Sequence, residues 1–275
     1  MSSGGPPSTG GSSSIFRRDK LGLAISAVLL STAGVSWVAV YTLMPLMSSS
    51  SDMMGVASMV SSLSLTSVGV FELVWVVGMA AMMFPAMIPI MLFYEKVATN
   101  AEPNPSLART VGTPLFLLGY LSMYAVLGLL AYLAVFAAVS ALPSIPLIAS
   151  IAFLGPTLVL ALAGLYQLSP LKIKALMYCI SPLGFFAAHS KKGLFGSFQM
   201  GVSNGTYCVG CCWAYMLVML AIAVMSLPFM IIIAGLIVIE KVIARGAVWF
   251  NRVVAASFLL VAAAVLFFPN LLSML

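Results

Sequence analysis

The sequence predicts an all-α protein, a membrane bundle of about seven transmembrane helices. Of the 275 residues, 63% are hydrophobic and 7% are charged, whereas roughly a quarter of the residues of a soluble domain are charged. Apolar runs of about twenty residues recur along the chain, and a helix of that length spans the hydrocarbon core of a bilayer. Because a helix satisfies its own backbone polar groups in lipid, the recurring runs indicate a helical bundle.

The chain divides into a short polar tail and one transmembrane domain. Residues 1–20 begin with a stretch rich in Gly, Ser and Pro, which cannot form a hydrophobic core, so we expect a disordered cytoplasmic tail there. Residues 21–275 form a single transmembrane helical domain. Its apolar runs predict spans at 21–46, 71–94, 113–141, 147–169, 201–225, 227–244 and 252–272.

The positions of the basic residues support this division. The 12 lysines and arginines fall into four groups. The first group precedes the first span. The others lie between spans two and three, four and five, and six and seven, or at the span ends that adjoin these segments. Positively charged loops remain in the cytoplasm, so the pattern predicts a multi-pass protein of the cell membrane with a cytoplasmic N-terminus and an external C-terminus. The lipid bilayer is therefore an expected partner. The sequence shows no clustered basic face that would favour nucleic acid.

Methionines form a stripe in the second predicted span. Met79, Met83 and Met87 recur every four residues, so their thioethers lie on one helix face, and Met82 flanks them. Thioethers are soft ligands that select copper(I), which makes the stripe a candidate path for copper. The alternative is that these side chains fill an irregular core, as methionine does well. Further methionines lie in the outer segment 47–70, whose role the sequence leaves open.

Cysteines carry the strongest functional signal. Cys208, Cys211 and Cys212 stand at i, i+3 and i+4 in the fifth predicted span, so they share one helix face. Cys179 is a short loop away, in the inner segment 170–195, which we expect to lie along the membrane surface. Thiolates select copper(I), zinc or iron–sulfur clusters. The alternatives are redox exchange between the thiols and plain apolar packing.

Small residues precede and separate these thiols. Gly201, Gly205 and Gly210 follow the spacing that lets membrane helices approach one another closely. The fifth span is therefore predicted to pack tightly against neighbouring helices.

Charged groups with an enzymatic arrangement are not evident in the sequence. Glu240 and Lys241 stand at the inner end of the sixth span, where we expect an interfacial pair. The sequence contains no nucleophile–base–acid set, no phosphate-binding loop and no paired catalytic carboxylates. Classical hydrolase and nucleotide-driven chemistry are therefore disfavoured.

Several motifs together resemble a known family. They are a tryptophan with a Met-Met-x-Pro segment, a Tyr-Gln-x-x-Pro-Leu-Lys element, a Tyr-Cys-x-Gly-Cys-Cys-Trp signature and a Glu-Lys ending. The residues are Trp75, Met79, Ala81, Met82, Met83, Pro85, Tyr166, Gln167, Pro170, Leu171, Lys172, Cys179, Ser181, Pro182, Gly201, Gly205, Tyr207, Cys208, Gly210, Cys211, Cys212, Trp213, Glu240 and Lys241. This set is similar to that of the integral membrane proteins catalogued as domain of unknown function 2182, which are described as predicted metal-binding proteins. The resemblance implies metal binding; the chain departs from the pattern at Ala175, where a cysteine is common, and at Asn204, where a histidine is common.

The leading hypothesis is an integral membrane protein that binds a soft metal ion, copper(I) first and zinc second, and handles its transport or delivery. The predicted ligands are Cys179, Cys208, Cys211, Cys212, Met79, Met82, Met83 and Met87. One alternative is an accessory or structural subunit of a larger membrane metalloenzyme, which would bind other membrane proteins or further copies of itself. The other is a membrane thiol–disulfide protein that uses Cys208 and Cys211.

Overall fold

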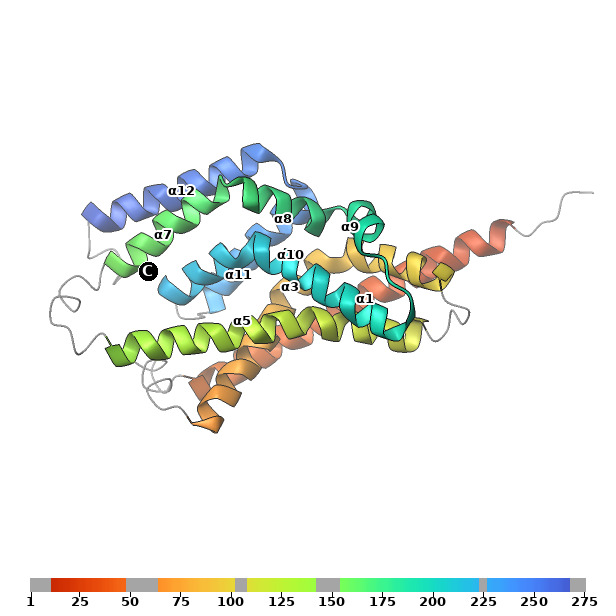
Figure 1. Ribbon diagram of the computed structural model, residues 1–275, viewed down its shortest axis with the longest axis horizontal. Helices are drawn as coiled ribbons and strands as arrows, with labels where there is room; N and C mark the ends of the chain where they lie inside the picture. Colours follow the sequence, from red (N-terminus) through yellow and green to blue (C-terminus); the bar gives the residue numbers. More distant parts are fainter. Residues whose placement is uncertain (1–10, 48–63, 102–107, 142–153, 223–226, 268–275) are drawn as a thin grey trace, which may run out of the picture.

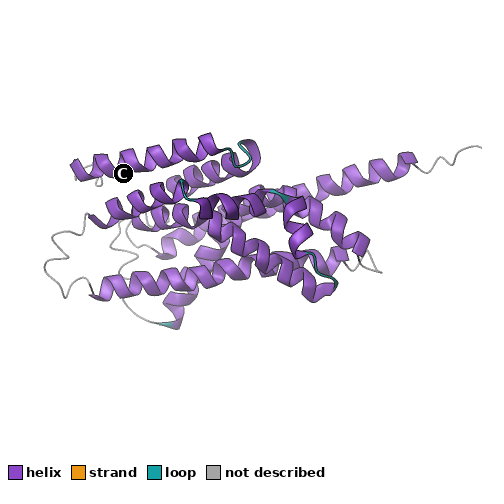
Figure 2. Cartoon of the chain, turned by 45° about the horizontal axis from the view of Figure 1, so that its top comes forward, coloured by secondary structure: helices purple, strands orange, loops and turns teal. Residues whose placement is uncertain are grey.

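The fold is entirely helical in the part of the chain that the computed structural model describes, residues 11–47, 64–101, 108–141, 154–222 and 227–267 (Figure 1). No strand occurs among these residues (Figure 2), so the prediction of an all-α fold is confirmed. The elements are α1 (Gly11–Met47), α3 (Leu65–Ala101), η1 (Ala108–Gly112), α5 (Thr113–Ala141), α7 (Leu154–Gln167), α8 (Pro170–Ile180), α9 (Pro182–His189), α10 (Gly193–Ile222), α11 (Leu227–Val238), η3 (Ile239–Ile243) and α12 (Val248–Phe267). The two η elements are π-helical turns.

Five helices in the described ranges are long and apolar enough to cross a membrane. They cover Gly22–Leu43, Leu65–Val97, Thr110–Ser140, Gly193–Ala221 and Val248–Phe267. The pair α7 and α8 passes the same test together but bends by 66°. The stretch predicted at 227–244 is divided between α11 and η3. In the described residues, each of the seven predicted spans overlaps a helix, while five helices, or six with the bent pair, have the length and composition of a membrane crossing.

The bend between α7 and α8 follows from Ser169 and Pro170. Pro170 has no N–H to donate to the preceding turn, so a new helix begins there. The Ser169 side chain caps this helix by accepting a hydrogen bond from the Lys172 N–H at 3.2 Å. Helix α8 packs against α10 and buries Cys179. That segment 170–195 lies along the membrane surface stays a prediction.

Neighbouring helices in the bundle run side by side. Helix α1 packs along α3, α5 along α10, and α12 along α7 (Figure 1). The indole N–H of Trp75 in α3 donates to the backbone oxygen of Tyr124 in α5 at 3.0 Å, which joins these two helices in the core. Helix α1 begins at Gly11, inside the predicted tail of residues 1–20. The orientation of the bundle across a membrane remains a prediction.

Glycines bring α5 and α10 into backbone contact. A Cβ atom added at Gly201 in α10 would lie 2.0 Å from the backbone oxygen of Phe116 in α5. One added at Gly119 in α5 would lie 2.2 Å from the backbone oxygen of Phe198 in α10. Carbonyl oxygens cannot yield as flexible side chains do, so glycine is required at both crossings. The prediction of close helix approach at Gly201 is confirmed.

Replacing Gly201 by Ala is expected to destabilise the protein by about 1–3 kcal/mol, because the added methyl group forces α5 and α10 apart. Thermal unfolding of the detergent-purified protein, followed by circular dichroism, measures the effect. Gly34→Ala in α1 is the matched control, since a Cβ atom there meets nothing within 4 Å. Equal unfolding temperatures for the two variants would contradict the backbone contact.

Candidate metal centre

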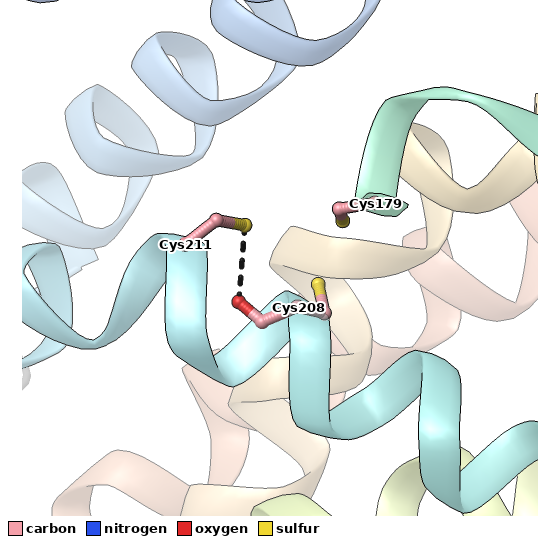
Figure 3. Close-up of side chains that lie close together, drawn as sticks. All are labelled: Cys179, Cys208 and Cys211. Atoms are coloured by element: carbon pink, nitrogen blue, oxygen red, sulfur yellow. Dashed lines mark hydrogen bonds between the residues drawn. The ribbon is translucent and has the colours of Figure 1, made fainter. Parts of the chain in front are cut away.

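Three cysteine sulfurs converge where the end of α8 meets the middle of α10. The Sγ atoms of Cys179, Cys208 and Cys211 all lie within 4.8 Å of one another, and all three side chains are buried (Figure 3). Cys208 and Cys211 are one helical turn apart on α10, and Cys179 comes from the last turn of α8. The cluster therefore draws on two helices, which relieves the strain of gathering three ligands from one helix face. We refer to these three residues as the thiol cluster.

Local contacts fix α8 against α10 at this point. A Cβ atom added at Gly210 would lie 3.2 Å from the Cβ of Ala175, so the two helices approach closely beside the thiol cluster. The Tyr166 hydroxyl, just before the bend, donates to the Gly210 backbone oxygen at 2.5 Å. The α8 helix then ends at Ile180, and the N–H of Ser181 donates to the Met177 backbone oxygen. These contacts set the position of Cys179 relative to α10.

Cys212 lies beside the thiol cluster without belonging to it. Its Sγ is 3.3 Å from the Sγ of Cys211. The Cys211 thiol donates to the backbone oxygen of Cys208 at 3.2 Å. All four cysteines are free thiols. The structure thus brings together three of the four cysteines predicted as ligands and places the fourth next to them.

The sulfur of Cys208 is the most heavily contacted of the cluster. The Nζ of Lys241, in the π-helical turn η3, donates to it at 2.8 Å. The Tyr120 hydroxyl of α5 lies 3.0 Å from the same sulfur and 3.3 Å from the Tyr124 hydroxyl. An ammonium and a hydroxyl on one sulfur form charge-assisted hydrogen bonds that stabilise a thiolate.

A second buried polar group lies next to the thiol cluster and does not include its sulfurs. Lys172 and Glu240 form an ion pair of 2.5 Å, and both side chains are completely buried. The Tyr215 hydroxyl donates to the other Glu240 carboxylate oxygen at 3.0 Å. Lys172 also donates to the Gln167 side-chain oxygen and lies 4.8 Å from the centre of the Tyr215 ring. The Lys172 ammonium is therefore fully engaged by its own partners.

The expectation of an interfacial Glu240–Lys241 pair is wrong, because both side chains are buried and face different partners. Glu240 contacts Lys172 and Tyr215, whereas Lys241 contacts Cys208. Both residues stand in η3, and single π-helical turns of this kind are frequent at functional sites. Sequence reasoning missed Lys241 and Tyr120 as neighbours of the cluster. The Glu-Lys motif was a signal for Lys241, but no motif marked Tyr120.

The methionine stripe lies in the core of the bundle. Met79, Met82, Met83 and Met87 are all buried on α3. Burial fits core packing and metal binding equally well, so their role as ligands remains a prediction. Of the methionines in segment 47–70, Met47 is the last residue of α1, and Met53, Met54 and Met59 lie outside the described ranges.

The fold and the cluster define a class of protein: an all-α protein with several apolar helices of membrane-spanning length and three buried cysteine sulfurs close together between two helices. Residues 72–266 match the model of the family described as PpoB2, copper chaperone, and the chain belongs to that family. The assignment to the domain of unknown function 2182 family is thereby corrected, since the matching family model is PpoB2. Comparison with curated proteins and with solved structures gave no match. The family and the cysteine cluster together fit copper handling.

Proposed function

We propose that this protein binds copper(I) inside the membrane through the thiol cluster and passes the ion on to another molecule. The observation that carries the proposal is the convergence of three buried sulfurs within 4.8 Å. Soft thiolate ligands favour copper(I). The description of the family as copper chaperones supports the choice of ion and the role in delivery.

The spacing of the sulfurs suits a single ion. Metal–thiolate bonds are about 2.3 Å long, taking zinc as a guide, so two sulfurs on opposite sides of an ion lie about 4.6 Å apart. Three sulfurs around an ion in one plane lie about 4 Å apart by the same bond length. The cluster has sulfurs within 4.8 Å of one another, so small side-chain movements suffice for either geometry. Zinc is the second candidate, because it also accepts thiolate ligands.

Further sulfur ligands give the ion a route. In the proposal, Cys212 replaces Cys211 as a ligand of the ion. The two sulfurs lie 3.3 Å apart. Met79, Met82, Met83 and Met87 form a path of neutral thioethers along α3. Thioethers carry no charge and hold the ion more weakly than thiolates, so copper would move along them toward the cluster. The bundle itself is proposed to lie in the cell membrane, in line with its long apolar helices.

Metal retention by the wild-type protein tests this function directly. Detergent-purified protein is reconstituted with copper(I) under reducing conditions, dialysed and analysed by mass spectrometry for copper and zinc. Retention of about one copper ion per chain is the expected result, because one thiol cluster is present in the described residues. Protein that retains no metal, but forms a reversible disulfide between Cys208 and Cys211, would instead establish the redox alternative.

A further inference from the structure

We propose that the cavity between α5 and α10 binds one acyl chain of a membrane phospholipid. This cavity has a volume of about 390 Å³ and is lined by residues of α3, α5, α7 and α10. None of the described residues that line it is a predicted metal ligand, so the site is separate from the thiol cluster. The inference therefore goes beyond the copper function proposed above and does not depend on it.

Small side chains on α5 leave room for this cavity. The residues of α5 that line it recur with the spacing of one helix face and are Leu127, Leu130, Ala131, Ala134, Val135 and Ala138. The three alanines among them extend only a Cβ atom toward α10. In the first half of α5, by contrast, Gly119 brings the two helices into backbone contact. The cavity therefore lies in the second half of α5.

The lining of the cavity selects an apolar occupant. None of the described residues that line it is charged. Trp75 and Met216 form the inner wall, and they are only 1% and 3% exposed. The indole N–H of Trp75 already donates to the backbone oxygen of Tyr124. Because waters in a cavity need polar partners, a hydrocarbon chain is the occupant that this lining stabilises.

The cavity opens toward the bilayer. Leu130 and Leu217 line it and are 58% and 40% exposed. Both belong to helices that have the length and composition of a membrane crossing. In the membrane, their exposed apolar surface faces lipid, so a chain of a neighbouring phospholipid can enter from the side.

The dimensions of the cavity fit a single acyl chain. Along α5 the lining residues run from Leu127 to Ala138, which is about 16 Å at 1.5 Å per residue. One half of the hydrocarbon core of a bilayer is about 15 Å thick, so the cavity matches one leaflet. Over this length, its volume of 390 Å³ gives a mean cross-section of about 24 Å², whereas a helix about 10 Å wide has about 80 Å². The cavity is therefore too narrow for a helix of a second copy.

The two ends of the cavity determine the orientation of the chain. A Cβ atom added at Gly128 would lie 2.6 Å from the Trp75 ring, so Trp75 stands at the Leu127 end. The opposite end, at Ala138, is close to the last residue of α5, Ala141, where a membrane helix reaches the polar head groups. The methyl end of the chain thus lies beside Trp75.

Fluorescence of Trp75 tests the site. With the substitutions Trp37→Phe, Trp213→Phe and Trp249→Phe, Trp75 is the only tryptophan left in the chain. This protein is reconstituted in phosphatidylcholine that carries bromine, a quencher of indole fluorescence, near the methyl ends of its acyl chains. Strong quenching of Trp75 is expected, because the brominated end of the chain lies against a ring that the bundle otherwise buries. Unquenched fluorescence would overturn the inference.

A cavity-filling variant separates the bound chain from the surrounding lipid. Ala134→Phe, added to the single-tryptophan protein, fills the cavity at an exposed lining residue and is expected to remove most of the quenching. Ala137→Phe is the matched control, because Ala137 is exposed on α5 outside the cavity, and it should leave the quenching unchanged. Equal quenching in the two variants would overturn the inference.

Mass spectrometry of the detergent-purified wild-type protein gives a test that needs no substitution, and it decides if circular dichroism shows that a variant fails to fold. Retention of one phospholipid per chain is the expected result. A lipid-free monomer would overturn the inference, and a lipid-free dimer would overturn it in favour of a second copy of the chain at the cavity.

Discussion

Replacing Cys208 by Ser is expected to abolish copper retention after dialysis and to weaken copper(I) binding by more than about 100-fold, beyond the usual cost of losing an outer-shell partner. Cys208 contributes one of the three clustered sulfurs and is the one that contacts both Lys241 and Tyr120. Serine keeps the size of the side chain but replaces a soft sulfur with a hard oxygen. Copper content by mass spectrometry and chelator competition both measure the loss.

Cys212→Ser is the matched control for this variant. Cys212 is buried on the same helix, and its sulfur lies 3.3 Å from that of Cys211 but outside the thiol cluster. It is expected to retain copper at close to the wild-type level, with slower transfer to an acceptor chelator. The reverse ranking, with Cys212→Ser empty and Cys208→Ser loaded, would contradict the cluster and shift the site to the Cys211–Cys212 pair.

The sequence predicts the α10 part of this site better than its surroundings. The spacing of Cys208 and Cys211 places two sulfurs on one face once the segment is known to be a helix. The sequence predicts that Cys179 lies near these thiols but does not predict how near. Its distance from α10 depends on the bend at Pro170 and on the packing of α8. Proline marks where one helix ends, but it does not determine the direction that the next helix takes.

Charged residues show the main limit of sequence reasoning here. Span prediction from apolar runs assigns Lys172 and Lys241 to the polar ends of helices, as it does every basic residue. Both are buried, because they contact partners distant in the sequence: Lys172 forms an ion pair with Glu240, and Lys241 donates a hydrogen bond to Cys208. A π-helical turn such as η3 has no recognisable sequence pattern, so the separate directions taken by Glu240 and Lys241 emerge only from the structure.

Replacing Lys172 by Met is expected to destabilise the protein by about 3–5 kcal/mol, because it leaves the Glu240 carboxylate buried without its cation. Unfolding in detergent, followed by circular dichroism, measures the change in the free energy of unfolding. Lys174→Met on the same helix is the matched control, since that lysine is exposed, and a surface substitution of this kind changes stability by at most about 0.5 kcal/mol.

A second substitution shows whether Lys172→Met loses stability because Glu240 is left unpaired or because side-chain packing is lost. The double variant with Lys172→Met and Glu240→Gln removes both charges, and Gln can still accept the hydrogen bond from Tyr215. It is expected to be more stable than Lys172→Met alone, because replacing a whole buried ion pair is often nearly neutral whereas breaking one is not. If the double variant is as unstable as the sum of Lys172→Met and Glu240→Gln, the two charges act independently.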